Sequence, residues 1–261
     1  AAVVKYPYTA TTTPKEGKFG FFQSERDTYL RIAGALGIPC TLTPDGVTAV
    51  RHPLVYLVEA ADDICYEVMD IEDAYKLRLL SADEALGLYL AFFSPDERRR
   101  LSAAYPETTS PGDRVAYCRS CVINALERAA VNVFVENEEA ILAGTFTGSL
   151  IDHMPEPLLS AYRHCERVAY ARIYNSREVT DIDLAGYRII YTLLELMTEA
   201  VLQPDKAYSR LLLQQVSAQY QLDAPRLIDR IMAVLDYVSG MTDVYALDLY
   251  RKINGHSLPS V

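Results

Sequence analysis

The sequence has no run of apolar residues that approaches the ~20 needed for a helix to cross a bilayer. Its first residues do not combine a basic segment with a long apolar stretch, as a secretory signal does. It also has few basic residues, 25 against 35 acidic ones, which gives a net charge of −10. We therefore expect no membrane association, and a wholly basic nucleic-acid-binding surface is disfavoured, although a local basic channel is not.

Several catalytic signatures are absent as well. The chain contains neither GxxxxGK[ST] nor GxGxxG, so P-loop and Rossmann chemistry are not expected. It contains neither HExxH nor GxSxG. The four histidines are dispersed and none is followed by an aspartate: His52, His153, His164 and His256. The sequence therefore offers no complete histidine-rich metal site.

Cysteines are few and odd in number, five in 261 residues. Most lie in apolar helical patterns, which favours a reduced, cytoplasmic protein. Cys118 and Cys121 form a CxxC pattern, but it lies within a helical stretch and no second pair exists for zinc. Core packing is the favoured interpretation of this pair, with a redox or metal role as the alternative.

One stretch, residues 53–79, organises the rest of the chain. Its apolar residues recur at the three- and four-residue steps of one helix face, and Pro53 suits the first helical turn. Asp62, Tyr66 and Asp70 are each four apart and form a second stripe along the same helix. Acids beside an apolar face need a cation or hydrogen bonds. The stripe predicts a site, and the alternative is a polar edge that meets water.

The remaining pattern predicts one mainly α-helical domain over residues 1–261. Residues 1–23 are expected to be two extended pieces around a loop, and Ser24 is the predicted N-cap of a helix to Leu36. Residues 40–51 are predicted to be a loop, and no convincing strand follows residue 23. Beyond residue 79, helices are expected at 81–93, from 94, and at 114–142, 155–174, 179–202, 205–219, 223–239 and 243–253.

Two groups of basic residues are candidate anion ligands. Lys5, Tyr6, Lys15 and Lys18 surround the N-terminal loop and could donate to a phosphate; scattered surface lysines are the alternative. Arg119 lies among apolar helix positions, where a guanidinium needs an acid or a phosphate.

Several segments follow one another along the chain: Lys5-Tyr6-Pro7, residues 20–25, 59–66, 143–146, 184–188 and 237–247. In this order they resemble segments of the deoxyguanosine-triphosphate triphosphohydrolase (dGTPase) family of HD-domain phosphohydrolases. The resemblance covers nearly the whole chain. It implies an all-α, multi-helix HD-domain-like fold, represented here in part. It also implies metal-dependent hydrolysis, with Mg²⁺ or Mn²⁺, of dGTP or another deoxynucleoside triphosphate to the deoxynucleoside and tripolyphosphate.

The resemblance also implies roles for particular residues. Asp62 matches a metal ligand, whereas Tyr66 and Asp70 match positions that contact the deoxyribose. Residues matching phosphate ligands are Lys5, Tyr6, Lys18 and Arg119. Residues matching the base site are Tyr174, which would stack on the base, Asp183, which stands where some members use Glu, and Arg210, which would reach a neighbouring subunit's pocket.

The chain departs from the family at its start. The family's first metal-binding His, its His-Asp doublet and the residues that assist the water precede the Lys-Tyr-Pro segment, which here begins at residue 5. We therefore expect the C-terminal portion of a dGTPase-like protein, with an incomplete metal site and no activity alone. A nucleotide-binding regulatory module and a purely structural helical domain are the alternatives. The resemblance further implies a homo-oligomer, and a nucleotide or single-stranded DNA as a possible effector.

Overall fold

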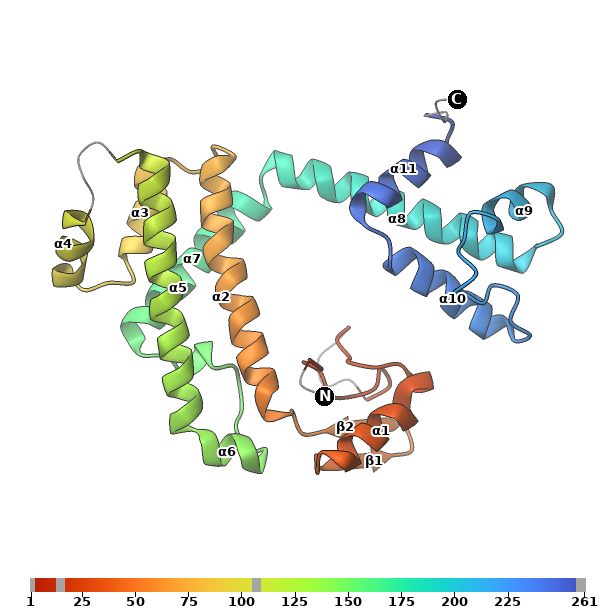
Figure 1. Ribbon diagram of the computed structural model, residues 1–261, viewed down its shortest axis with the longest axis horizontal. Coiled ribbons are helices and arrows are strands. Elements are labelled where there is room, and N and C mark those ends of the chain that lie inside the picture. Colours follow the sequence, from red (N-terminus) through yellow and green to blue (C-terminus); the bar gives the residue numbers. More distant parts are fainter. Residues whose placement is uncertain (1–2, 13–16, 105–108, 257–261) are drawn as a thin grey trace. The chain divides into compact units, whose positions relative to one another are not determined.

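The computed structural model describes residues 3–12, 17–104 and 109–256 and divides the chain into two compact units. Unit 1 covers residues 1–174 and unit 2 covers residues 175–261. Eleven α-helices and one two-stranded sheet make up the regular structure of the described residues, which confirms the all-α class (Figure 1). Whether the two units form one domain stays a prediction.

Unit 1 begins with a small layer on its own core of Phe21, Tyr29, Ala33 and Val47. A 3₁₀ turn, η1 (Gln23–Glu25), leads into α1 (Arg26–Ala35), and an antiparallel hairpin of β1 (Cys40–Thr43) and β2 (Gly46–Ala49) follows. The prediction of a loop at 40–51 was therefore wrong. Each strand has four residues, and the Pro-Asp-Gly turn signal between them hid the short alternating pattern.

Ser24 is not the N-cap of the first helix, contrary to the sequence prediction. It lies inside η1, and the chain entry is fixed by Glu25, whose carboxylate accepts a hydrogen bond from the Phe22 N–H at 2.9 Å. Glu25 thus satisfies the N–H of Phe22, which is the N-cap of η1 and lies two residues before Ser24.

Helices form the rest of unit 1 and pack around the two longest of them. They are α2 (Pro53–Lys76), α3 (Ala82–Leu90), α4 (Pro95–Ala103), α5 (Pro111–Glu136), α6 (Glu138–Ala143), η2 (Ile151–His153), α7 (Glu156–Val168) and the π-helical turn η3 (Ala169–Tyr174). The predicted helix 114–142 is two helices in the structure, and the predicted helix 155–174 ends in the π turn. Ser81 and Ser94 cap α3 and α4 as predicted, each paired with a glutamate three residues on.

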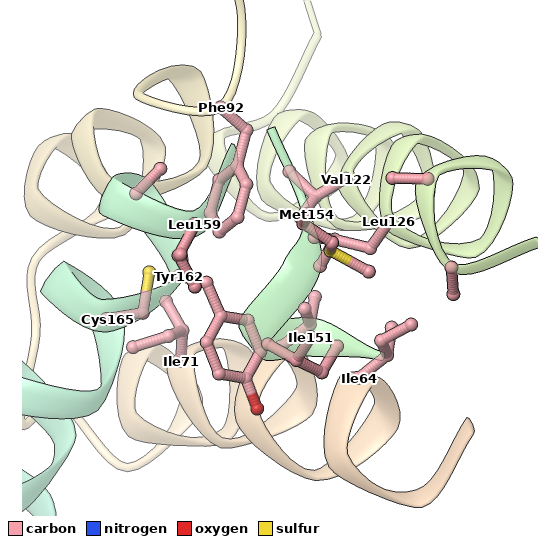
Figure 2. Close-up of a cluster of buried hydrophobic side chains, with 14 of the residues drawn as sticks. Ile64, Ile71, Phe92, Val122, Leu126, Ile151, Met154, Leu159, Tyr162 and Cys165 are labelled. Carbon is pink, nitrogen blue, oxygen red and sulfur yellow. The ribbon is translucent and has the colours of Figure 1, made fainter. Parts of the chain in front are cut away.

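The main core lies between α2, α5 and α7. Ile64 and Ile71 of α2 meet Val122 and Leu126 of α5, and Tyr162 of α7 closes the cluster (Figure 2). Burial of these apolar side chains, at about 25 cal/mol per Å², holds α2 in a fixed rotation about its axis. That rotation decides which of its acids face solvent and which face α7.

Unit 2 consists of α8 (Arg177–Leu202), α9 (Ala207–Leu213), α10 (Leu227–Ser239) and α11 (Asp243–Ile253). Its core is formed mainly by Leu193, Met197, Leu212, Val234 and Tyr237. The predicted helices at 205–219 and 223–239 are both shorter than expected. No helix of the described residues is long and apolar enough to cross a membrane.

Candidate functional site

Three residues predicted from the sequence meet in unit 1. The Tyr174 hydroxyl, at the end of η3, donates to Asp70 Oδ2 at 2.6 Å. The Tyr66 ring lies 6.2 Å from the Tyr174 ring between centroids, with the planes tilted by 32°. Burial raises the pKa of Asp70, and the bond from Tyr174 opposes that rise. The four-residue spacing of α2 thus places the Asp70 carboxyl group near two aromatic rings.

A cavity of about 470 Å³ opens beside this group. Its aromatic walls are Tyr66 from α2, Tyr162 from α7, and Tyr170 and Tyr174 from η3. The Tyr162 hydroxyl donates to the Asp63 backbone carbonyl at 3.1 Å, which ties α7 to α2. The π turn that carries Tyr170 and Tyr174 is a form of helix often found at functional sites. The cavity therefore offers the planar rings of four tyrosines to a ligand.

Sequence reasoning missed Glu67, which also lines this cavity. Glu67 is 5% exposed, and its Oε1 atom is buried without a hydrogen-bond partner among the residues that the structure describes. Burial, followed by the charges of Glu166 and Asp70, raises the pKa of Glu67 to about 7. A signal was present: Glu67 stands three residues after Ile64 and four before Ile71, on the buried face of α2.

The predicted phosphate ligand Lys5 lies against the first half of α2. Its Nζ is 3.4 Å from Glu59 Oε1 and 3.6 Å from Asp63 Oδ1, and Asp63 lines the cavity. Burial lowers the pKa of Lys5, but the carboxylates of Asp63 and Glu59 more than compensate, so the net shift is upward. Arg51 also binds Glu59. Lys5 therefore lies at the rim of a cavity whose lining holds more acids than bases.

The other residues of the N-terminal segment are less closely tied to the cavity. The Tyr6 ring packs near the Tyr8 ring, with centroids 6.0 Å apart, and Lys18 is exposed. Lys15 lies outside the described residues. The structure thus brings Lys5 to the cavity rim, while the predicted roles of Tyr6 and Lys18 stay predictions.

Asp62, the predicted metal ligand, is exposed on α2 and forms no ion pair within the described part of the chain. In residues 3–12, 17–104 and 109–256, no three His, Cys, Asp or Glu side chains are placed to hold a metal ion. A divalent cation needs several ligands at once. Asp62 could supply one of them, but the described residues do not fit a complete metal site.

Arg119 lies away from the tyrosine cavity. Its guanidinium pairs with Glu72 of α2, whose side chain is 6% exposed, and Lys76 Nζ is 3.5 Å from the same carboxylate. Arg119 and Met69 line a separate cavity of about 350 Å³. The structure thus satisfies the guanidinium with an acid, which was one of the two alternatives left open by the sequence.

The remaining candidates have different surroundings. Asp183 on α8 and Arg210 on α9 are exposed residues of unit 2, whereas the residues lining the tyrosine cavity all belong to unit 1. Cys118 is completely buried in the main core and Cys121 is half-buried, and neither forms a disulfide. Core packing therefore accounts for Cys118 of the CxxC pattern.

Known proteins resemble the chain along nearly its whole length. A protein of Pseudomonas aeruginosa named deoxyguanosinetriphosphate triphosphohydrolase-like is 32% identical over 98% of this chain and 59% of its own. A Listeria monocytogenes protein of the same name is 31% identical over the same shares. The deoxyguanosinetriphosphate triphosphohydrolase of Yersinia enterocolitica is 25% identical over 78% of this chain and 48% of its own.

Residues 153–252 also match a family described as a phosphohydrolase-associated domain. This match runs from η2 through α11 and so covers parts of both units. The chain spans 59% of the length of the Pseudomonas and Listeria relatives. The kinship confirms the family predicted from the ordered segments of the sequence.

Proposed function

The chain belongs to the family of deoxyguanosinetriphosphate triphosphohydrolase-like proteins, and from that premise we propose that it supplies the nucleoside-binding part of a deoxynucleoside triphosphate triphosphohydrolase. The observation that carries the proposal is the grouping of Tyr66, Asp70 and Tyr174: the two tyrosines line one cavity, and the Tyr174 hydroxyl binds Asp70 beside it. An aromatic face suits a base or a sugar, and a carboxylate accepts hydrogen bonds from a sugar hydroxyl. The name of the Yersinia relative supports dGTP as the substrate to test first.

Lys5 is the proposed phosphate ligand nearest the cavity. An ammonium group attracts phosphate oxygens as a point charge, and its pairing with Asp63 and Glu59 holds it beside α2. Tyr6, Lys18 and Arg119 are proposed as further phosphate ligands from the family resemblance. Arg119 would have to share its guanidinium with Glu72, because that ion pair is already formed.

We also propose that Asp62 contributes one ligand to the Mg²⁺ or Mn²⁺ of the hydrolytic reaction. The described residues provide no complete site, so the further ligands would have to come from elsewhere. This chain by itself is therefore expected to bind a nucleotide without hydrolysing it. Base reading by Asp183, a contribution of Arg210 to a neighbouring subunit, a homo-oligomer, an effector and a cytoplasmic location stay predictions.

Calorimetric titration of this chain with dGTP tests the nucleoside site. Removal of the Tyr174 ring and its bond to Asp70, in Tyr174→Ala, should weaken binding at least about tenfold, since stacking on an aromatic side chain is worth roughly 1–3 kcal/mol per base. Tyr117→Ala is the matched control: Tyr117 is a half-exposed tyrosine of α5 and is not part of the cavity lining. Equal losses in the two variants would contradict the proposal.

A second assay addresses catalysis. The chain is incubated with dGTP and Mn²⁺ or Mg²⁺, and tripolyphosphate is measured. No release is expected from this chain alone, and robust turnover would show that it holds a complete site after all. Titrations repeated with a chelator separate the enzyme portion from a regulatory module, because strong metal-dependent binding counts against the latter.

A further inference from the structure

Glu67 lines the cavity, and the family resemblance supplies no role for it. It is almost fully buried, yet its Oε1 atom has no partner among the described residues. A buried carboxylate without a hydrogen bond or a cation costs folding free energy. Glu67 lines the cavity beside Tyr66, Tyr162 and Tyr174, so a bound molecule could reach its carboxyl group.

The charge of the cavity limits what that molecule can be. Asp63, Asp152 and Glu166 line it together with Glu67, whereas Arg163 is the cation of the described lining. Arg163 lies 3.8 Å from Asp152, so its charge is shared with that acid. Four carboxyl groups repel phosphate, and no three metal-ligating side chains among the described residues converge on a cation site. A group that donates hydrogen bonds suits such carboxyl groups, and the uncharged O–H and N–H groups of a nucleoside are of this kind.

We propose that Glu67 determines specificity in this cavity by accepting a hydrogen bond from an O–H or N–H group of the nucleoside, with the phosphates directed to Lys5 at the rim. The donor is a sugar hydroxyl or a base N–H. This inference rests on the proposed nucleoside site and assigns an orientation and a further contact to it. The unsatisfied Oε1 atom is the acceptor that the ligand completes.

The assignment has a consequence for pH. Glu166 and Asp70 raise the pKa of Glu67 to about 7, after the larger effect of burial. The other titratable or charged groups that face it are Tyr162, Cys165, Tyr174, Asp63, Asp152 and Arg163. A donor on the ligand favours the ionised carboxylate. Affinity is therefore expected to rise by about tenfold between pH 6 and pH 8, with release of a proton on binding.

Titration of this chain with 2′-deoxyguanosine at pH 6, 7 and 8 provides the test, because the probe carries no phosphate. In Glu67→Gln the rise with pH should disappear, and affinity at pH 8 should fall by about tenfold. Glu67→Asp should keep a pH-dependent affinity. Glu127→Gln removes an exposed α5 carboxylate outside this cavity and should behave like the unchanged chain. Thermal melts of each variant verify the fold.

Two further probes identify the donor. If a sugar hydroxyl bonds Glu67, 2′,3′-dideoxyguanosine should bind the unchanged chain and Glu67→Gln equally. If a base amino group does, thymidine should do so instead. A rise in affinity with pH that persists in Glu67→Gln, or unchanged affinity at pH 8, would overturn the role of Glu67. If Tyr174→Ala still abolishes binding in that case, the nucleoside site itself stands; if nothing binds the unchanged chain, both proposals fail.

Discussion

Two buried glutamates lie five residues apart on α2 and differ in whether the protein provides a partner for the carboxylate. Glu72 is 6% exposed and is bound by Arg119 of α5, with Lys76 close by. Glu67 is 5% exposed and faces α7 and the tyrosine cavity with an unpartnered Oε1 atom. The two residues have nearly the same exposed fraction, so what separates them is the partner of the carboxylate; burial, and then the charges of Glu166 and Asp70, raise the pKa of Glu67 to about 7.

The difference is the neighbour that each helix face meets. A charge taken out of water needs a partner of opposite charge or several hydrogen bonds, and Arg119 provides this for Glu72. Glu67 has Glu166 and Asp70 as its charged neighbours, which add to the cost of its ionisation. A buried acid with a cation serves the packing of α2 against α5, whereas a buried acid without one is available to a ligand.

The largest expected effect comes from removing Arg119, the ion-pair partner of Glu72. Arg119→Met removes the guanidinium and leaves the buried carboxylate with only the exposed Lys76 nearby, which should lower the free energy of unfolding by about 3 kcal/mol. Urea denaturation at pH 7 measures the change. The double variant Glu72→Gln/Arg119→Met removes both charges and should recover most of the loss. If Arg119→Met alone is neutral, Glu72 does not depend on Arg119, and the contrast with Glu67 fails.

The opposite change applies to Glu67. Its folded-state pKa of about 7 exceeds the ordinary value of 4.5, so the native state favours the protonated acid. The stability linked to this proton is complete below about pH 4.5 and is lost as the pH rises through 7. Glu67→Gln carries no such charge. It should therefore match the unchanged chain at pH 4 and exceed its free energy of unfolding by roughly 3 kcal/mol at pH 8.

Urea denaturation at the two pH values measures this gap, and the Asp63, Asp70 and Glu166 titrations largely cancel in the difference between the proteins. Glu72→Gln is the comparison at the other site. It should be less stable than the unchanged chain at pH 8, because Arg119 loses its ion-pair partner. A Glu67→Gln variant that is less stable at pH 8 would mean that the carboxylate has a stabilising partner within the protein.

Much of the fold follows from the sequence because local signals and packing agree there. The apolar spacing of residues 53–79 predicted α2, and Ser81 and Ser94 marked the starts of α3 and α4. The β1–β2 hairpin was missed because each strand has only four residues, and β2 also has support from residues far away in the sequence: the Thr9 N–H donates to the Val47 carbonyl at 3.0 Å, and Tyr8 bridges Thr48. Such contacts leave no mark in a four-residue pattern.

The site was predictable to the extent that it lies on one helix. The four-residue spacing related Tyr66 to Asp70, but only the family resemblance related them to Tyr174, which follows 104 residues after Asp70 in the chain. Glu67 was overlooked because the sequence alone did not distinguish this acid on an apolar face from the exposed acids near it on α2. The partner of Arg119 was also left open, since helix spacing does not say which residue of α2 faces α5.

Asp70 is the intermediate case between the two glutamates, because its partner is a neutral donor. Tyr174→Phe keeps the ring and removes the 2.6 Å bond to Asp70 Oδ2. One hydrogen bond of this kind is worth about 1 kcal/mol, so this should be the smallest of the three stability changes.

The same substitution should change the pKa of Asp70. Burial already raises this pKa, and it should rise further in Tyr174→Phe because the Tyr174 bond lowers it. Nuclear magnetic resonance titration of the Asp70 carboxyl carbon measures that shift, with Tyr245→Phe, which loses a tyrosine pair in unit 2, as the control. An Asp70 pKa that stays the same in Tyr174→Phe would mean that a neutral donor does nothing for a half-buried acid here, and that the charge of Arg119, not hydrogen bonding, separates Glu72 from Glu67.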